Sequence, residues 1–178
     1  MTWADTRREI VLAIYPSSRG FGWIALEGPF AVVESGLHQA TKDKNAGCVR
    51  ALDRLIRRIK PSALVLEAFD KRSSVRSGRI RRLCLSFVTL AADRGLELAV
   101  YTRDEVRAAF ASVEAYTRDE TAEAVAKALP AIAHRLPKKR GAGDSEDKRL
   151  SVFNAAAVAL THYGNGATAL LDELRDAA

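Results

Sequence analysis

The sequence has little of what metal clusters, disulfide frameworks and membrane spans require. It contains two cysteines and three histidines, and Cys48 and Cys84 lie in helical patterns without the Cys or His spacing of a zinc site. No apolar run approaches the roughly 20 residues of a transmembrane helix, and the opening residues MTWADTRRE are too charged to lead a signal peptide. We therefore expect a cytoplasmic protein with no membrane segment, no zinc and no structural disulfide.

Positive charge exceeds negative charge. The 178 residues include 28 Lys and Arg against 22 Asp and Glu, a formal net charge of +6, and 48% of them are hydrophobic. This size and composition suit one domain with its own core, so we expect a single domain over residues 1–178. The excess of positive charge permits binding to a polyanion but does not by itself require it.

The basic residues are clustered. The strongest run, 71–82, holds no acidic residue and supplies Lys71, Arg72, Arg76, Arg79, Arg81 and Arg82. A second cluster comprises Lys138, Lys139 and Arg140. Because basic loops with interspersed hydroxyls suit phosphate oxygens, we predict that both clusters contact nucleic acid. A third basic group, at 50–60, is equally well explained as the solvated face of a helix.

Hydrophobic periodicity predicts a mixed sheet. The short apolar segments expected to form strands are 9–14, 21–26, 30–34, 63–66 and 96–101. The first three are joined by short turns and predict an antiparallel meander, whereas helical patterns at 45–60 and 80–91 separate the later ones. This order is that of an α/β, RNase H-like fold, with a five-stranded sheet of three antiparallel and two parallel strands and helices on both faces. A doubly wound α/β fold remains the alternative.

The pentapeptide Tyr-Thr-Arg-Asp-Glu occurs twice, at 101–105 and 116–120. Each copy places Thr three residues before Glu, which is the spacing of a capping box at the start of a helix. We interpret the repetition as helix-start chemistry and not as a repeat architecture. A last, almost wholly apolar helix is expected to begin at 145–147 and to lie in the core.

Three motifs carry a resemblance to a known family. They are Ile-Tyr-Pro-Ser-Ser-Arg-Gly-Phe-Gly at 14–22, Val-Leu-Glu at 65–67, and Ala-Ala-Ala-Val-Ala-Leu-Thr-His at 155–162. In this order, at the ends of the first and fourth strands and in a late helix, they resemble RuvC-type Holliday junction resolvases of the RNase H-like superfamily. The resemblance implies Mg²⁺ or Mn²⁺ as cofactor if the protein is an active enzyme, and no cofactor otherwise, and it places a catalytic glutamate at Glu67.

The same resemblance indicates a defective acidic site. Two-metal phosphodiester hydrolysis needs carboxylates that hold the ions close together, but Tyr15 and Asn154 stand where the family has aspartates. Neither a phenol nor an amide supplies the missing negative charge. The acids that remain as candidate catalytic or metal-binding residues are Glu67, Asp147 and Glu146, although the last two are more typical of a helix start. Asn154 is a candidate hydrogen-bond partner for Glu67.

Three functions therefore stay open. The first is a protein of resolvase ancestry that binds branched double-stranded DNA and has weak or no hydrolytic activity, with Arg19 as a further phosphate contact. The second is an active Mg²⁺- or Mn²⁺-dependent endonuclease that uses Glu67 with Glu146 or Asp147. The third is a protein-interaction module without DNA binding. The resemblance also implies a homodimer. His162 is expected either to bond backbone carbonyls near a helix end or to transfer protons at the site.

Overall fold

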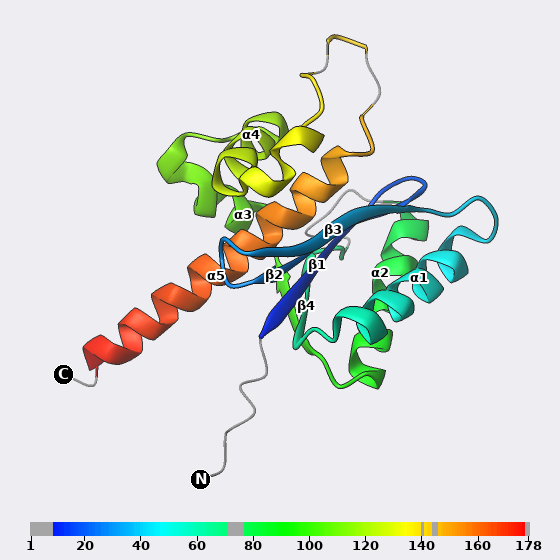
Figure 1. Ribbon diagram of the computed structural model, residues 1–178, viewed down its shortest axis with the longest axis horizontal. Coiled ribbons are helices and arrows are strands. Elements are labelled where there is room, and N and C mark those ends of the chain that lie inside the picture. Colours follow the sequence, from blue (N-terminus) through cyan, green and yellow to red (C-terminus); the bar gives the residue numbers. More distant parts are fainter. Residues whose placement is uncertain (1–8, 71–76, 140, 144–145, 177–178) are drawn as a thin grey trace.

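The protein is built around one five-stranded sheet (Figure 1). The computed structural model describes residues 9–70, 77–139, 141–143 and 146–176, with side chains described as far as residue 164. The strand order is β3-β2-β1-β4-β5. The strands are β1 (Ile10–Pro16), β2 (Gly20–Glu27), β3 (Val32–Gln39), β4 (Ala63–Glu67) and β5 (Glu97–Tyr101).

The sheet is mixed, as the periodicity predicted. β1 pairs with β2 and β2 with β3 in antiparallel fashion, whereas β4 runs parallel to both β1 and β5. The register opposes Ile14 to Leu66 and Glu67 to Tyr101. The carboxyl ends of β1, β4 and β5 therefore meet at one edge of the sheet, which is where polar side chains can converge.

Helices cover both faces of the sheet (Figure 1). The helical elements are α1 (Lys44–Ile59), α2 (Gly78–Asp93), α3 (Arg103–Phe110), η1 (Ala111–Val113), α4 (Arg118–Ala128), η2 (Pro130–Arg135) and α5 (Leu150–Asp176). Along β1 the side chains alternate: Leu12 and Ile14 pack with α1 and α2, whereas Val11 and Ala13 pack with α4 and α5. Both faces of β1 are thus buried, which explains why its sequence is apolar without interruption.

Two predicted boundaries were wrong. β3 runs from Val32 to Gln39 and not over 30–34, because an edge strand can hold polar residues that break the apolar pattern. α5 begins at Leu150, later than the expected 145–147. The Asp147 carbonyl accepts the Leu150 N–H at 2.9 Å, and the Asp147 carboxylate accepts the Arg149 N–H at 2.9 Å. Asp147 therefore closes a turn before the helix. Among the described residues, no helix is long and apolar enough to cross a membrane.

Candidate functional site

Glu67 and Tyr15 lie side by side at the carboxyl edge of the sheet. Each follows directly on one of the opposed residues Leu66 and Ile14, so the two strands end together. Only 6% of the Glu67 side chain is exposed. A carboxylate buried to this degree needs a charged or hydrogen-bonding partner to stay ionised.

Arg118 supplies that partner. Its Nη2 donates to Oε1 of Glu67 at 3.3 Å, and its guanidinium carbon lies 5.2 Å from the centroid of the Tyr15 ring. This distance is typical of a cation–π contact. Burial works against the charged form, but Tyr15, Glu67 and Glu146 together raise the pKa of Arg118 above its ordinary value. The cation beside Glu67 is therefore part of the protein itself.

Arg103 brings a second guanidinium toward the same carboxylate. It is the first residue of α3, two positions beyond Tyr101, the strand partner of Glu67. Burial, followed by repulsion from Arg118, lowers the pKa of Arg103, while Glu67 acts in the opposite direction. Two guanidinium groups thus lie within electrostatic reach of Glu67.

Both arginines owe their positions to capping boxes. Thr102 and Thr117 accept the backbone N–H of Glu105 and Glu120, each at 3.1 Å, and the two glutamates accept the threonine N–H groups in return. The capping predicted from the repeated pentapeptide is confirmed. Its consequence was missed: the residue after each Thr is an Arg in the first helical turn. The guanidinium groups of both arginines interact electrostatically with Glu67.

The late helix contributes uncharged side chains to this edge. Ser151 lines a cleft together with Tyr15, and its hydroxyl donates to the Lys148 carbonyl at 2.6 Å. A Cβ on Gly22 would lie 2.4 Å from the Ser151 Oγ and backbone, so glycine at that point of β2 lets α5 pack directly on the sheet.

Asn154 lies one turn further along α5 and is 4% exposed. Its Nδ2 finds no hydrogen-bond partner among the described residues. The expected hydrogen bond from Asn154 to Glu67 is therefore not made.

The other predicted acids sit at the mouth of the cleft. Glu146 is exposed, and both oxygens of Asp147 bond the guanidinium of Arg149, at 2.7 Å from Oδ2 to Nη2 and 3.1 Å from Oδ1 to Nε. The hydrogen bonds from Arg149 hold the pKa of Asp147 below its ordinary value. The cleft encloses about 590 Å³, and its lining includes Tyr15, Arg19, His38, Glu146, Asp147 and Lys148.

The side chains around Glu67 do not fit a divalent cation. Mg²⁺ and Mn²⁺ prefer several oxygen ligands with negative charge, whereas Glu67 accepts a hydrogen bond from a guanidinium that also contacts the phenol ring of Tyr15. Within the described parts of the chain, no cluster of three or more His, Cys, Asp or Glu side chains is arranged to hold a metal ion.

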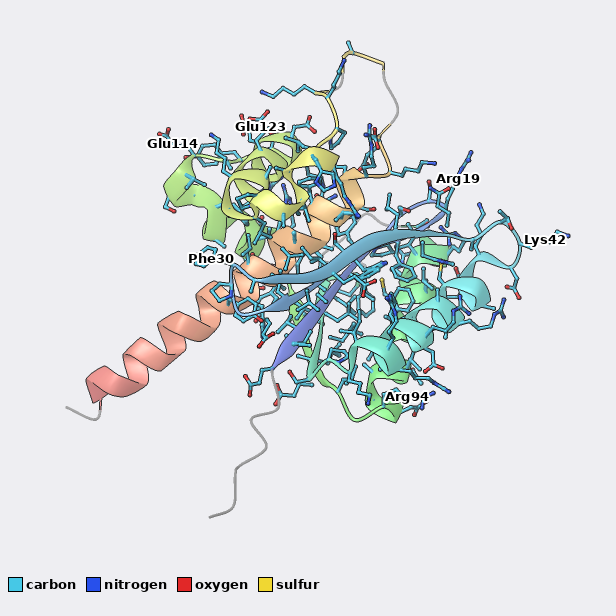
Figure 2. All side chains as sticks on the ribbon, in the orientation of Figure 1. Arg19, Phe30, Lys42, Arg94, Glu114 and Glu123 are labelled. Carbon is cyan, nitrogen blue, oxygen red and sulfur yellow. The ribbon has the colours of Figure 1, made fainter. Side chains whose placement is uncertain are left out.

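The basic residues predicted to bind nucleic acid are found in different settings. Arg19 is exposed on the loop between β1 and β2 (Figure 2). Arg79 bonds inward, to the carbonyls of Ser17 and Ser18 and to Asn45, and so fixes that loop. Arg81 and Arg82 lie in the first turns of α2, and Arg82 is exposed.

The second basic cluster is divided in the same way. Lys138 is exposed, and Lys139 pairs with Glu123 of α4 at 3.1 Å. Lys71, Arg72, Arg76 and Arg140 lie outside the described residues.

His162 has a side-chain partner at Nδ1, whereas its two expected roles were to bond backbone carbonyls or to transfer protons at the site. Its Nδ1 lies 2.7 Å from the hydroxyl of Tyr101, at the end of β5. Burial lowers the pKa of His162 below its ordinary value of 6.5, which favours the neutral ring. His162 therefore joins α5 to the sheet.

Comparison with known proteins bears on the fold. No protein-family model matches the sequence, and neither does any curated protein. Two similar solved structures are Thermus thermophilus RuvC in complex with a Holliday junction substrate and Thermus thermophilus RuvC alone. The first has a TM-score of 0.66 and 19% identity and covers 90% of this chain and 96% of that one. The second has a TM-score of 0.61 and 19% identity and covers 86% and 92%. The protein has the RuvC-like, RNase H-like fold that the motifs predicted.

Proposed function

We propose that this protein binds branched double-stranded DNA and does not hydrolyse it. The observation that carries the proposal is the contact between Arg118 and Glu67, since it puts a permanent cation of the protein beside the acidic residue that ends β4. The fold resembles a protein solved with a Holliday junction substrate, which suggests the class of DNA.

The loss of hydrolysis follows from charge. A divalent ion bound at Glu67 would have to compete with a guanidinium 3.3 Å away and would be repelled by Arg103 as well. Tyr15 and Asn154 are neutral and cannot offset that repulsion. The site therefore favours an anion over a cation, and a DNA phosphate is an anion.

An active Mg²⁺- or Mn²⁺-dependent nuclease is the second candidate. It is favoured by one observation, namely that Glu146 and Asp147 line the same cleft as Tyr15. Asp147 would first have to release Arg149, and such a nuclease would depend on Glu67.

DNA binding is tested by fluorescence anisotropy with a four-way junction and a linear duplex of equal length, in EDTA over a range of salt concentrations. We expect tighter binding to the junction and an affinity that falls as salt rises. Arg19→Gln should weaken junction binding. Arg94→Gln, which removes a charge paired with Asp53 at the C-terminal end of α2, away from the loop that holds Arg19 (Figure 2), should not. Equal effects of the two substitutions would contradict a DNA contact at Arg19, and no binding to either DNA would favour a protein-interaction module.

Cleavage is tested with the same junction in Mg²⁺ and in Mn²⁺. We expect none from the unaltered protein, and a gain only when Tyr15→Asp and Asn154→Asp are combined with Arg118→Gln. Cleavage by the unaltered protein that disappeared in Glu67→Ala would establish the nuclease instead. Light scattering of the same samples tests the proposed homodimer, which would match the twofold symmetry of a junction.

A further inference from the structure

The guanidinium of Arg118 has donor capacity that the described residues leave unused. Nη2 bonds Glu67, but Nη1 is buried and finds no partner among the described residues. An unsatisfied buried donor is costly, and a charged one more so. A site with such a donor is chemically incomplete without an acceptor.

A second unused donor lies on α5. Nδ2 of Asn154 is likewise buried without a hydrogen-bond partner among the described residues. Asn154 is one turn from Ser151, which packs on Gly22, the strand partner of Tyr15. The ring of Tyr15 in turn contacts the guanidinium of Arg118, so Tyr15 connects the surroundings of the two donors. Donors cannot ligate a metal ion, whereas they suit the oxygens of an anion.

The surrounding charge selects an anion too. Arg103 and Arg118 each begin a helix, at the positive end of its dipole, and both lie within electrostatic reach of Glu67. The planar fork of an arginine matches two oxygens of a phosphate in a way that lysine does not.

From these observations we infer that Arg118, supported by Arg103 and Asn154, forms a metal-independent phosphate site in which Glu67 is a built-in competitor for the guanidinium. The inference rests on the proposed function in that a backbone phosphate of the bound DNA would be the ligand. Glu67 then has a regulatory role, because it competes for the guanidinium and weakens the binding of any single phosphate. The affinity for DNA then depends also on contacts that the protein makes elsewhere on the DNA.

The competition gives opposite predictions for two substitutions. Inorganic phosphate is titrated into the protein in EDTA and followed by calorimetry. Arg118→Gln should weaken phosphate binding at least tenfold, and Arg118→Lys should restore only part of it. Glu67→Gln should tighten phosphate binding several-fold, because the guanidinium no longer has an internal anion. Arg149→Gln, which removes a charge paired with Asp147 just before α5, should change it less than twofold.

Two results would overturn the inference. One is phosphate binding that is indifferent to Arg118→Gln in a variant whose circular dichroism is unchanged. The other is Glu67→Gln with unchanged or weaker phosphate binding, which is the result expected if Arg118 merely stabilises the fold. The Glu67→Gln measurement keeps the inference testable should Arg118→Gln fail to fold.

Junction binding by the same variants separates this inference from the proposed function. Junction binding in EDTA together with phosphate binding independent of Arg118 contradicts the phosphate site and leaves DNA binding intact. Phosphate binding that requires Arg118 in a protein that binds no junction supports the anion site and contradicts DNA as its ligand.

Discussion

The two copies of Tyr-Thr-Arg-Asp-Glu form the same local structure and then diverge. Both Thr residues cap a helix, and both Glu residues complete the box. In the copy at 101–105 the Tyr bonds His162, and burial lowers the pKa of Arg103. In the copy at 116–120 the Tyr is exposed, and the Arg reaches Glu67 and the ring of Tyr15. Identical residues thus acquire different roles from the elements packed against them.

The largest expected difference between the copies concerns their arginines. Arg118→Gln removes the cation that is bonded to the buried Glu67, and we expect a loss of about 2 to 3 kcal/mol in the free energy of unfolding. The expected loss is smaller than for a fully buried ion pair because Arg118 is partly exposed. Arg103→Gln relieves repulsion and should change stability by less than about 1 kcal/mol. Urea denaturation measures both. Equal losses would mean that the two arginines are equivalent.

The tyrosines should differ next. Tyr101→Phe removes the partner of a half-buried His162 and should cost about 1 kcal/mol of unfolding free energy. The matched change Tyr116→Phe removes an exposed hydroxyl from a ring that is 59% exposed, and stability should stay within about 0.5 kcal/mol. Thermal melts of the two variants compare them directly. A larger effect at Tyr116 would contradict the contact between Tyr101 and His162.

The two caps should be alike in stability but not in binding. Thr102→Ala and Thr117→Ala each remove one side-chain acceptor at a helix start and should each cost about 1 kcal/mol. Thr117→Ala loosens the turn that carries Arg118 and should weaken junction or phosphate binding by about two- to fivefold. Thr102→Ala loosens the turn of the supporting Arg103 and should weaken binding less. Anisotropy and calorimetry on the same preparations test this. A similar loss of binding in both variants would show that Arg103 matters as much as Arg118.

The smallest expected effect is a dependence on pH that involves the first copy alone. Because burial lowers the folded-state pKa of His162 below 6.5, the unfolded chain takes up the proton first as pH falls. The neutral ring of His162 therefore contributes in full to the free energy of unfolding above pH 6.5, and this contribution is lost as pH falls through the folded-state pKa.

We expect His162→Gln to reduce the difference in unfolding free energy between pH 7.5 and pH 5.5. His38, whose pKa is lowered by burial and by Arg54, contributes in the same direction and remains in the variant. An unchanged difference would show that His162 does not titrate differently in the folded and unfolded states.

Much of the fold was accessible from the sequence because its signals are local. Alternating or continuous apolar runs identified the five strands, and the Thr-to-Glu spacing identified two helix starts. The errors arose where a local pattern is weak. β3 is an edge strand with Ser35, Gly36 and His38 in it, and Gly36 is there because a Cβ would lie 3.0 Å from the Trp23 ring.

The site was less accessible because it depends on contacts between distant segments. The ends of β1 and β4 could be matched, which placed Glu67 and Tyr15 together. Arg118 is 51 residues from Glu67, and nothing in its own surroundings distinguishes it from Arg103. The repeated pentapeptide was the available signal, because it predicted an arginine at the start of each of two helices. It did not predict how those helices are oriented relative to Glu67.

The central claim is that a guanidinium, and not a divalent metal ion, is the counter-charge of Glu67. Mn²⁺ titration followed by electron paramagnetic resonance tests it most directly, with the unaltered protein and Glu67→Gln compared at the same concentrations. The account predicts the same free Mn²⁺ signal for both, because any weak binding at exposed acids such as Glu146 is common to them. A bound Mn²⁺ ion present in the unaltered protein and lost in Glu67→Gln would contradict it.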